Sequence, residues 1–544
     1  MSFEELYDSC FRNVSLIKVS KKDKEPDAPS SLLVTLNHVM ATSTNVVFFL
    51  TAQNRGAELA LKLDHLVKKR NEKCDKDKPQ SSPARIRRFF GMKRKKSKKD
   101  GGLCNEEVTS VILVDTDYQA DGETAGTIPF AQPGWYIYAP QAATTKSRLL
   151  RALGFEFPPS LIVVDTLSKS VVTTQGRRYL AEDIDGNNFP WWPPHSSDLL
   201  KGTLVKRGGE KLEYSSLTET VRGFLFGAQW CPPARLWIKQ LIPVYESLRS
   251  NGKSIELVFC SSDRTQDAFD QFLEQMPWSA FSYDTAKTLA LTRLWNVSGI
   301  PALLLVDDKG TILSRHGRSS LLSDPLGQLF PWGFQSMYEL NELTMCRLRD
   351  EPSLILFTEG SPEDMQFSLS VLDSVARRLY EERIQIEEKR AEEREKRKED
   401  RENSENGNSL SKSSSSDECS SIDSSEMTIP PQADPLQILY TAEDPICDHI
   451  LEKILGLGDA PLPLLCIVDG LAGQFCICDE PDVSEQVVGQ FVEEYRRGKL
   501  KWIPLPGARE QASKNGASTI LQHTLVSESP SQNSLSDETK TESS

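Results

Sequence analysis

The sequence lacks long apolar runs and an export signal. No apolar stretch among the 544 residues approaches the roughly 18 that a membrane-spanning helix needs, so we expect no transmembrane segment. The opening residues, MSFEELYDSC, show no basic segment followed by an apolar one, so no secretory signal is expected. Without export, the 11 cysteines favour reduced thiols over a disulfide framework. The sequence therefore predicts a protein of the cytosol or the nucleus.

Apolar residues, positive charge and metal-type motifs are also scarce. Hydrophobic residues make up 38%, which predicts a folded majority diluted by polar, disordered segments. Lys and Arg number 64 against 78 Asp and Glu, and this net charge of -14 argues against general nucleic-acid binding. The six histidines form no metal-spaced pair, and no Ser/His/Asp set, P-loop or dinucleotide motif stands out. We predict neither a metal site nor a cofactor.

One set of landmarks occurs twice, about 140 residues apart. Four landmarks recur in the same order: a tryptophan in QPGW and MPW, a proline that opens PSLIVVD and PALLLVD, a glycine in QGRR and HGRS, and an F-P-W triplet. The corresponding residues are Trp135 and Trp278, Pro159 and Pro301, Gly176 and Gly317, and Phe189-Pro190-Trp191 and Phe330-Pro331-Trp332. A fainter third copy, PLLCIVD, opens at Pro463. The constant spacing predicts a duplicated domain with a third, more divergent relative.

Each block starts with a short apolar run, which predicts a buried strand at 45–52, 221–228 and 352–359. In the central block a helical pattern, a second strand at 254–260, a second helix and a hairpin from Pro301 follow. This is the order of a thioredoxin-like domain, and the alternation predicts the α/β class, with a central mixed sheet flanked by helices. We therefore predict three tandem thioredoxin-like domains, at 1–192, 193–338 and 339–505, and a disordered tail at 506–544.

Two spacers interrupt the blocks. The first, at 69–103, is basic and contains Lys93, Arg94, Lys95 and Lys96, a composition typical of a nuclear-import signal; a solvated basic loop is the alternative. Nucleic-acid binding by this insert is not favoured, because it lacks a folded frame. The second, at 381–434, combines a charged helix with a Ser-rich acidic stretch that we expect to be disordered. Kinase phosphorylation of this stretch and an unmodified linker both remain open.

The sharpest motif is Trp230-Cys231-Pro232-Pro233-Ala234, placed after a strand and before a helix. Its thiol is expected near the positive end of the helix dipole, which favours the thiolate. Pro232 and Pro233 suit a first helical turn, where no N–H bond is lost, and Trp230 is expected to cover one side of the sulfur. Pro301 stands where thioredoxin-like domains place a cis-proline beside the cysteine, presenting backbone to an extended substrate.

With its neighbouring motifs this segment resembles the nucleoredoxin family, three-thioredoxin-domain proteins related to tryparedoxin. The family's W-C-P-P-C-R stands here at 230–235, and its other marks stand as VFCSSD (258–263), MPW (276–278), GIPAL (299–303), GR (317–318) and FPW (330–332). The resemblance covers about 190–340 well and the flanks more weakly. It implies protein-disulfide reductase chemistry supported by glutathione or thioredoxin reductase. It also implies oxidation-sensitive binding of a dishevelled-type adaptor in Wnt signalling, in nucleus and cytoplasm.

The chain departs from the family at Ala234, which replaces the second cysteine of the motif. A dithiol reductase attacks a disulfide with its first thiolate and resolves the mixed disulfide with its second, an intramolecular step. Without that step, whether the protein is an enzyme stays open. One reading is a redox-sensitive signalling scaffold. The alternative is a monothiol oxidoreductase of protein or glutathione mixed disulfides that acts through Cys231.

The remaining cysteines and histidines receive structural readings. Cys260 is expected to be a buried strand residue rather than a resolving thiol. The flanking blocks, with 52–56 and 359–362 at the motif position, are expected to be redox-silent. Cys466, Cys476 and Cys478 are read as core or surface thiols, and His316 as a surface residue at a hairpin turn.

Overall fold

The computed structural model describes residues 2–19, 32–52, 55–76, 108–116, 128–139, 142–194, 196–308, 310–406 and 434–506. The chain forms two compact units. The first contains Met1–Lys201 together with Asp284–Gly299, and the second contains Gly202–Tyr283 and the described part of Ile300–Glu510. Three mixed sheets, one in the first unit and two in the second, provide the framework.

The first sheet has the order β2-β1-β5-β4-β3-β6-β7. At its centre β3 pairs in parallel with β4 and antiparallel with β6. Its strands are β1 (Ser15–Lys18), β2 (Leu32–Thr35), β3 (Asn45–Thr51), β4 (Thr109–Asp115), β5 (Tyr136–Tyr138), β6 (Ser160–Asp165) and β7 (Ser170–Thr173). The helices are α1 (Phe3–Leu6), a π-turn (Tyr7–Phe11), α2 (Leu36–Thr42), α3 (Ala57–Lys76), α4 (Ala143–Ala152), α5 (Gly176–Glu182) and α6 (Ser196–Leu199).

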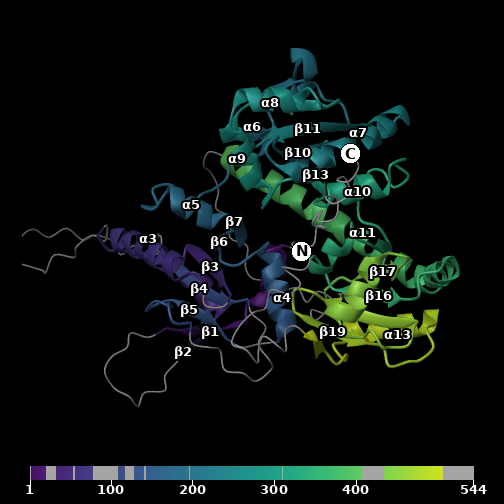
Figure 1. Cartoon of the computed structure of the whole chain (residues 1–544). Helices are drawn as coiled ribbons and strands as arrows, with labels where there is room; N and C mark the ends of the chain where they lie inside the picture. The colour runs from purple at the N-terminus through teal and green to yellow at the C-terminus, as the bar shows by residue number, and fades with distance from the viewer. Residues whose placement is uncertain are drawn as a thin grey trace, which may run out of the picture. The chain divides into compact units, whose positions relative to one another are not determined.

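The central sheet has the order β14-β13-β10-β11-β12-β8-β9 and repeats the central pairing of the first: β10 runs parallel to β11 and antiparallel to β13. Figure 1 labels β10, β11 and β13 together with α7, α8 and α10. The strands are β8 (Thr203–Val205), β9 (Lys211–Glu213), β10 (Val221–Gly227), β11 (Ile255–Ser261), β12 (Ser279–Phe281), β13 (Ala302–Asp307) and β14 (Ile312–Ser314). The helices are α7 (Pro232–Ser250), α8 (Gln266–Leu273), α9 (Thr285–Leu294, in the first unit) and α10 (Gly317–Ser323).

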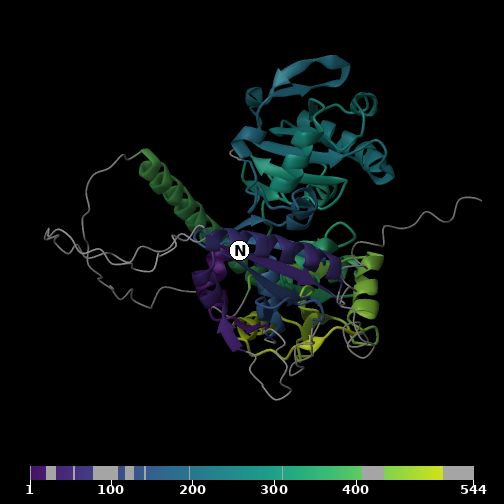
Figure 2. The ribbon, with the colours of Figure 1, turned by 90° about the vertical axis from the view of Figure 1, so that its left-hand side faces the viewer.

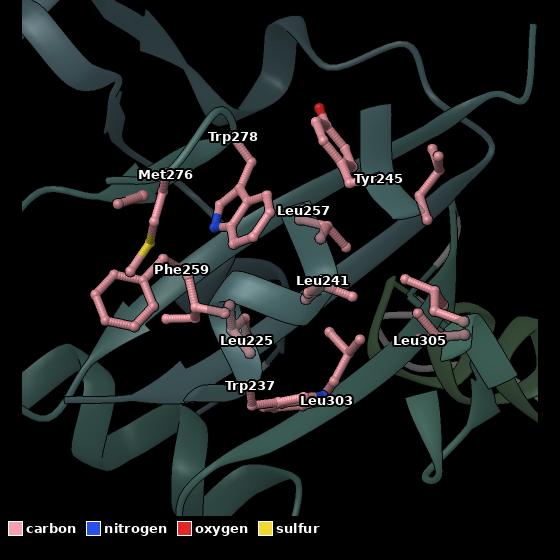
Figure 3. Close-up of a cluster of buried hydrophobic side chains, with 14 of the residues drawn as sticks. Leu225, Trp237, Leu241, Tyr245, Leu257, Phe259, Met276, Trp278, Leu303 and Leu305 are labelled. Carbon is pink, nitrogen blue, oxygen red and sulfur yellow. The ribbon is translucent and has the colours of Figure 1, made fainter. Parts of the chain in front are cut away.

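Alternating strand residues and α7 enclose the core behind the motif. In Figure 3, Leu225 of β10 and Phe259 of β11 lie near Trp237 and Leu241 of α7, and Trp278 lies against Tyr245 of the same helix. These side chains are at most 6% exposed. The strands that the apolar runs predict are therefore buried on the face that α7 covers. This close packing holds α7 against the sheet, and with it the helix N-terminus at Cys231.

The third sheet has the order β15-β17-β16-β18-β19-β20. The very long α11 connects the parallel strands β16 and β17, and Figure 2 shows its C-terminal half extending away from this sheet. The charged segment 381–402 is helical, as its composition predicts. The elements are β15 (Tyr338–Leu340), the 3-10 turn η4 (Met345–Arg349), β16 (Ser353–Phe357), α11 (Pro362–Asn406), β17 (Gln437–Thr441), α12 (Pro445–His449), a π-turn (Ile450–Ile454), β18 (Leu464–Asp469), β19 (Gln474–Ile477), α13 (Glu485–Arg496) and β20 (Ile503–Pro504).

The predicted α/β class with three thioredoxin-like sheets is confirmed. No described helix is long and apolar enough to cross a membrane. The first residues of the predicted basic insert belong to α3, which continues to Lys76. Lys93–Lys96, the Ser-rich stretch 409–427 and residues 507–544 lie outside the described residues, so the predictions about them stay predictions.

Candidate functional site

Cys231 stands between the end of β10 and the start of α7. Its backbone is extended, with φ -93° and ψ 107°, and it is the N-cap of the helix, with Pro232 and Pro233 in the first turn. Its carbonyl accepts the first helical hydrogen bond, from the Arg235 N–H at 3.2 Å. Neither proline removes a needed bond, because the first N–H groups of a helix have no intrahelical acceptor.

Cys231 lies in a small apolar cluster. Its side chain packs against Ala228, Ala234 and Ile300, and the residue is 7% exposed. The Sγ lies 3.8 Å from the carbonyl oxygen of Ile300, a weak S–H···O contact. The Ile300–Pro301 peptide bond is cis. The structure therefore brings Cys231 and the backbone at Pro301 together, as the sequence motif predicts.

Trp230 lies beside the thiol with much of its ring open to solvent, at 52% exposed. Its indole N–H donates to the carbonyl of Ser262 at 3.1 Å, just past the end of β11. The Arg264 guanidinium lies over the ring, 5.7 Å from its centroid. The ring is thus held at its polar end, and its exposed part offers an aromatic surface next to Cys231.

Asp263 is a positioning residue that the motifs alone do not indicate, although it ends the VFCSSD segment. It is 2% exposed and accepts hydrogen bonds from the Gln229 N–H at 2.7 Å and from the Ser261 hydroxyl at 2.8 Å. The Arg235 side chain donates to the Gln229 carbonyl at 2.6 Å. These bonds tie the loop before Cys231 to the end of β11 and to the first turn of α7.

The resolving position is filled by a buried methyl group. Ala234 is 1% exposed and packs against Cys231. Cys260 does not replace it: this residue is fully buried in β11, where its neighbour Phe259 faces the α7 core. Because successive strand side chains point to opposite faces, Cys260 points away from α7. No described thiol therefore occupies the position from which the family motif resolves a mixed disulfide.

The third block has no thiol at its motif position. Gly360 adopts φ 83°, and a Cβ there would lie 2.7 Å from the backbone of Ala442.

Cys466 and Cys476 are buried in β18 and β19, and burial raises the pKa of Cys476 to about 12. Cys478, half-buried, packs against the same core, so the reading of these three as structural thiols fits their placement. Within the described ranges, no group of three His, Cys, Asp or Glu side chains could hold a metal ion.

In the first block, residues 53–54 of the motif position lie outside the described residues. The peptide bonds before Pro159 and Pro463 are cis, like the one before Pro301. The cis bond is therefore present in all three blocks, whether or not a cysteine stands opposite.

The reading of His316 as a plain surface residue is wrong: its ring contacts Cys346 and Asp350 and its side chain is 22% exposed.

Comparison with known proteins places these features in a family context. The family described as "Thioredoxin-like" matches residues 219–312, and "Thioredoxin-like, C-terminal domain" matches residues 334–499. Nucleoredoxin of Danio rerio is 30% identical over 349 residues, covering 64% of this chain and 72% of the relative. Nucleoredoxin of Homo sapiens is 28% identical, covering 64% and 70%. Native tryparedoxin I from Crithidia fasciculata is 35% identical over 24% of this chain and 92% of that one, with a TM-score of 0.23.

Proposed function

The chain belongs to the nucleoredoxin family, and from this premise we propose that it is a redox-sensitive protein-binding scaffold that captures partners through the single thiol Cys231. The observation that carries the proposal is Ala234, a buried methyl group packed against Cys231 at the family's second-cysteine position. The site thus keeps the attacking thiol, its loop anchor and its cis-proline, but not the thiol that would release a partner.

Capture is the first half of a disulfide reduction. The Cys231 thiolate attacks one sulfur of a partner disulfide, a new S–S bond forms, and the other partner sulfur leaves as a thiolate. In a dithiol site the second thiolate then attacks the Cys231 sulfur and frees the partner within the same molecule. That intramolecular step has a large effective concentration, which Ala234 forfeits. The mixed disulfide therefore persists until an external thiol, such as glutathione, displaces it.

The surroundings of Cys231 support a protein partner. The aromatic surface of Trp230 is exposed beside Cys231, and the backbone carbonyl of Ile300, the residue before the cis-proline, contacts the sulfur. An extended polypeptide can lie on such a surface. A dishevelled-type adaptor, and hence regulation of Wnt signalling in cytoplasm and nucleus, is the partner and setting that the family resemblance suggests. Import through Lys93–Lys96 belongs to the same proposal.

Restoring the missing thiol tests the proposal. In an insulin-reduction assay with glutathione or thioredoxin reductase, the wild-type chain should turn over weakly or not at all. Ala234→Cys should raise turnover at least about tenfold, because the intramolecular step returns. Cys231→Ser combined with Ala234→Cys is the matched control and should be inactive. Comparable turnover by the wild type and Ala234→Cys would overturn the scaffold proposal.

A second function is favoured by the intact anchoring of the attacking thiol through Asp263 and Gln229. In this reading the chain is a monothiol oxidoreductase that uses free glutathione for the second step. Glutathione-dependent turnover by the wild type, abolished by Cys231→Ser, would establish it. A mixed disulfide that accumulates on Cys231 at millimolar glutathione would instead favour the scaffold.

A further inference from the structure

A second thiol site lies away from the motif, where the hairpin of the central sheet meets the turn before β16. His316 is the N-cap of α10, and its Nδ1 lies 3.3 Å from the Sγ of Cys346. Its Nε2 lies 2.5 Å from Oδ2 of Asp350. Cys346 lies within the short turn η4, and Asp350 is the C-cap of the same turn. The three side chains thus stand in the order thiol, imidazole, carboxylate.

The fold holds the imidazole in place between its two partners. The backbone N–H of His316 donates to the Ser314 hydroxyl at 3.1 Å, and its carbonyl accepts the Ser320 N–H at 2.9 Å. The side chain of His316 is 22% exposed, whereas that of Asp350 is 49% exposed. The group is therefore partly open to solvent, and small molecules can approach it from outside the core.

The hydrogen bonds determine where the protons lie. A carboxylate accepts only, so Nε2 of His316 carries the proton that it shares with Asp350. Burial alone would lower the pKa of His316, but the hydrogen bonds to Asp350 and Cys346 raise it to about 10. At neutral pH the ring is then an imidazolium, and its Nδ1–H points at the sulfur. The sulfur accepts this bond, and a charged donor beside it stabilises the negative charge that the sulfur carries when it attacks.

Cys346 has a second neighbour, the carbonyl oxygen of Leu343 at 3.6 Å, to which the S–H of a thiol can donate. The contact to the imidazole is the shorter of the two, at 3.3 Å, and the sulfur can accept from His316 while it donates to Leu343. Leu343 lies just before η4 and three residues from Cys346, so the local turn brings these two groups together.

We propose that Cys346 is a second reactive thiol, independent of Cys231, with His316 as its proton partner and Asp350 as the residue that orients the ring. Its substrates would be small peroxides and electrophiles. With hydrogen peroxide, the sulfur attacks one oxygen, an S–O bond forms and the O–O bond breaks. Cys346 is oxidised to the sulfenic acid and the peroxide is reduced. The leaving hydroxide takes the proton from Nδ1 of His316, so the products are one sulfenic acid, one water and a neutral imidazole.

Peptide-resolved alkylation of the full chain with iodoacetamide tests the site. At pH 7, Cys346 should react several-fold faster in the native chain than after denaturation in guanidinium, because unfolding separates it from His316. A buried structural thiol such as Cys466 should do the opposite. Native alkylation of Cys346 that is slower than in the denatured chain, or absent, would overturn the proposal without any variant.

Variants assign the roles. His316→Gln, which keeps a hydrogen-bonding side chain but cannot carry charge, should slow alkylation of Cys346 about tenfold and reduce dimedone labelling after peroxide by a similar factor. Asp350→Asn should have a smaller effect of about threefold, since it leaves the imidazole present. Cys231 in the same sample is the internal standard and should react unchanged. His38→Gln, on α2 of the first unit, is the matched control.

Circular dichroism and the unchanged rate at Cys231 verify that His316→Gln still folds. Equal reactivity of Cys346 in the wild type and in folded His316→Gln would show that the imidazole does not activate the thiol, and the proposal would fall. The Ala234→Cys experiment is unaffected by this outcome, because it involves neither His316 nor Cys346.

Discussion

At the scale of single residues, the close packing of α10 against β13 depends on a glycine that no other residue can replace without a shift. A Cβ at Gly317 would lie 2.7 Å from both the carbonyl oxygen and the Cγ of Leu303. Leu303 is the second residue of β13 and follows closely on Pro301. The first block has the same arrangement, since a Cβ at Gly176 would lie 2.6 Å from the carbonyl oxygen of Leu161. The recurrence of these glycines in the sequence thus reflects a close approach of helix and strand.

Gly317→Ala should therefore lower the free energy of unfolding by about 1–3 kcal/mol, the usual cost of forcing extra atoms into a packed site. Urea denaturation of the full chain measures it. Gly333→Ala is the matched control, because no atom lies within 4 Å of the Cβ that it would add. Equal urea midpoints for the two variants would show that the strand can shift at Leu303 to make room for the added methyl group at no cost in stability.

Residue patterns predicted the thiol, the prolines and the missing second cysteine, because these lie in one continuous segment. They did not predict the His316–Cys346–Asp350 group, whose members are spread over 34 residues and meet only when the hairpin packs against η4. Asp263 was missed for a related reason: its hydrogen bond to Gln229 joins residues 34 apart. In both cases a side chain alone in the sequence gives no sign of the partner that the fold supplies.

At the scale of elements, apolar runs located the strands that are buried on both faces. The run at 221–228 is β10, and that at 254–260 is β11. The short strands β8 and β9 were not predicted, because three-residue polar strands such as Lys211–Glu213 have neither an apolar run nor a clear alternation. They extend the sheet at its edge, where pairing rather than sequence determines the conformation.

The loop after α5 is an element held together by one carboxylate. Asp183 accepts hydrogen bonds from the backbone N–H groups of Asn187 and Asn188, both at 2.9 Å, and from the indole N–H of Trp191 at 3.0 Å. Burial alone would raise the pKa of Asp183, but these bonds, the one from Asn188 foremost, lower it. The ionised form is thus the one that the folded loop prefers.

The pH dependence follows from that direction. A lowered folded pKa contributes stability above the unfolded value of about 3.9, and the contribution is lost as the pH falls through the folded pKa. Asp183→Asn should lower the free energy of unfolding by about 1 kcal/mol at pH 7, and the difference from the wild type should shrink below about pH 4. Asp185→Asn, at an exposed carboxylate that pairs with Lys69, should change little. A deficit for Asp183→Asn that is constant with pH would contradict this role of the charge.

At the scale of the whole molecule, the same loop occurs once in each compact unit. Asp324 accepts hydrogen bonds from the N–H groups of Gln328 and Leu329, at 2.8 and 2.7 Å, and from the indole of Trp332 at 2.9 Å. It lies 141 residues after Asp183, the same spacing as the two F-P-W triplets. Two copies of one local structure, placed in separate units, allow the cooperativity of the chain to be measured with matched substitutions.

If each unit unfolds by itself, a substitution that destabilises one loop should change the rate of amide hydrogen exchange only in the sheet to which that loop belongs. Asp183→Asn should speed hydrogen exchange of the slowest amides in β3, β4 and β6 about fivefold, as expected for a loss of about 1 kcal/mol, and leave β10, β11 and β13 unchanged. Asp324→Asn should do the reverse. Hydrogen-exchange mass spectrometry on the full chain resolves both sets of peptides in one experiment, so each variant controls for the other. Acceleration of both sets by either variant would mean that the first and central sheets unfold as one cooperative body, in which case events at Cys231 would be coupled energetically to the first block.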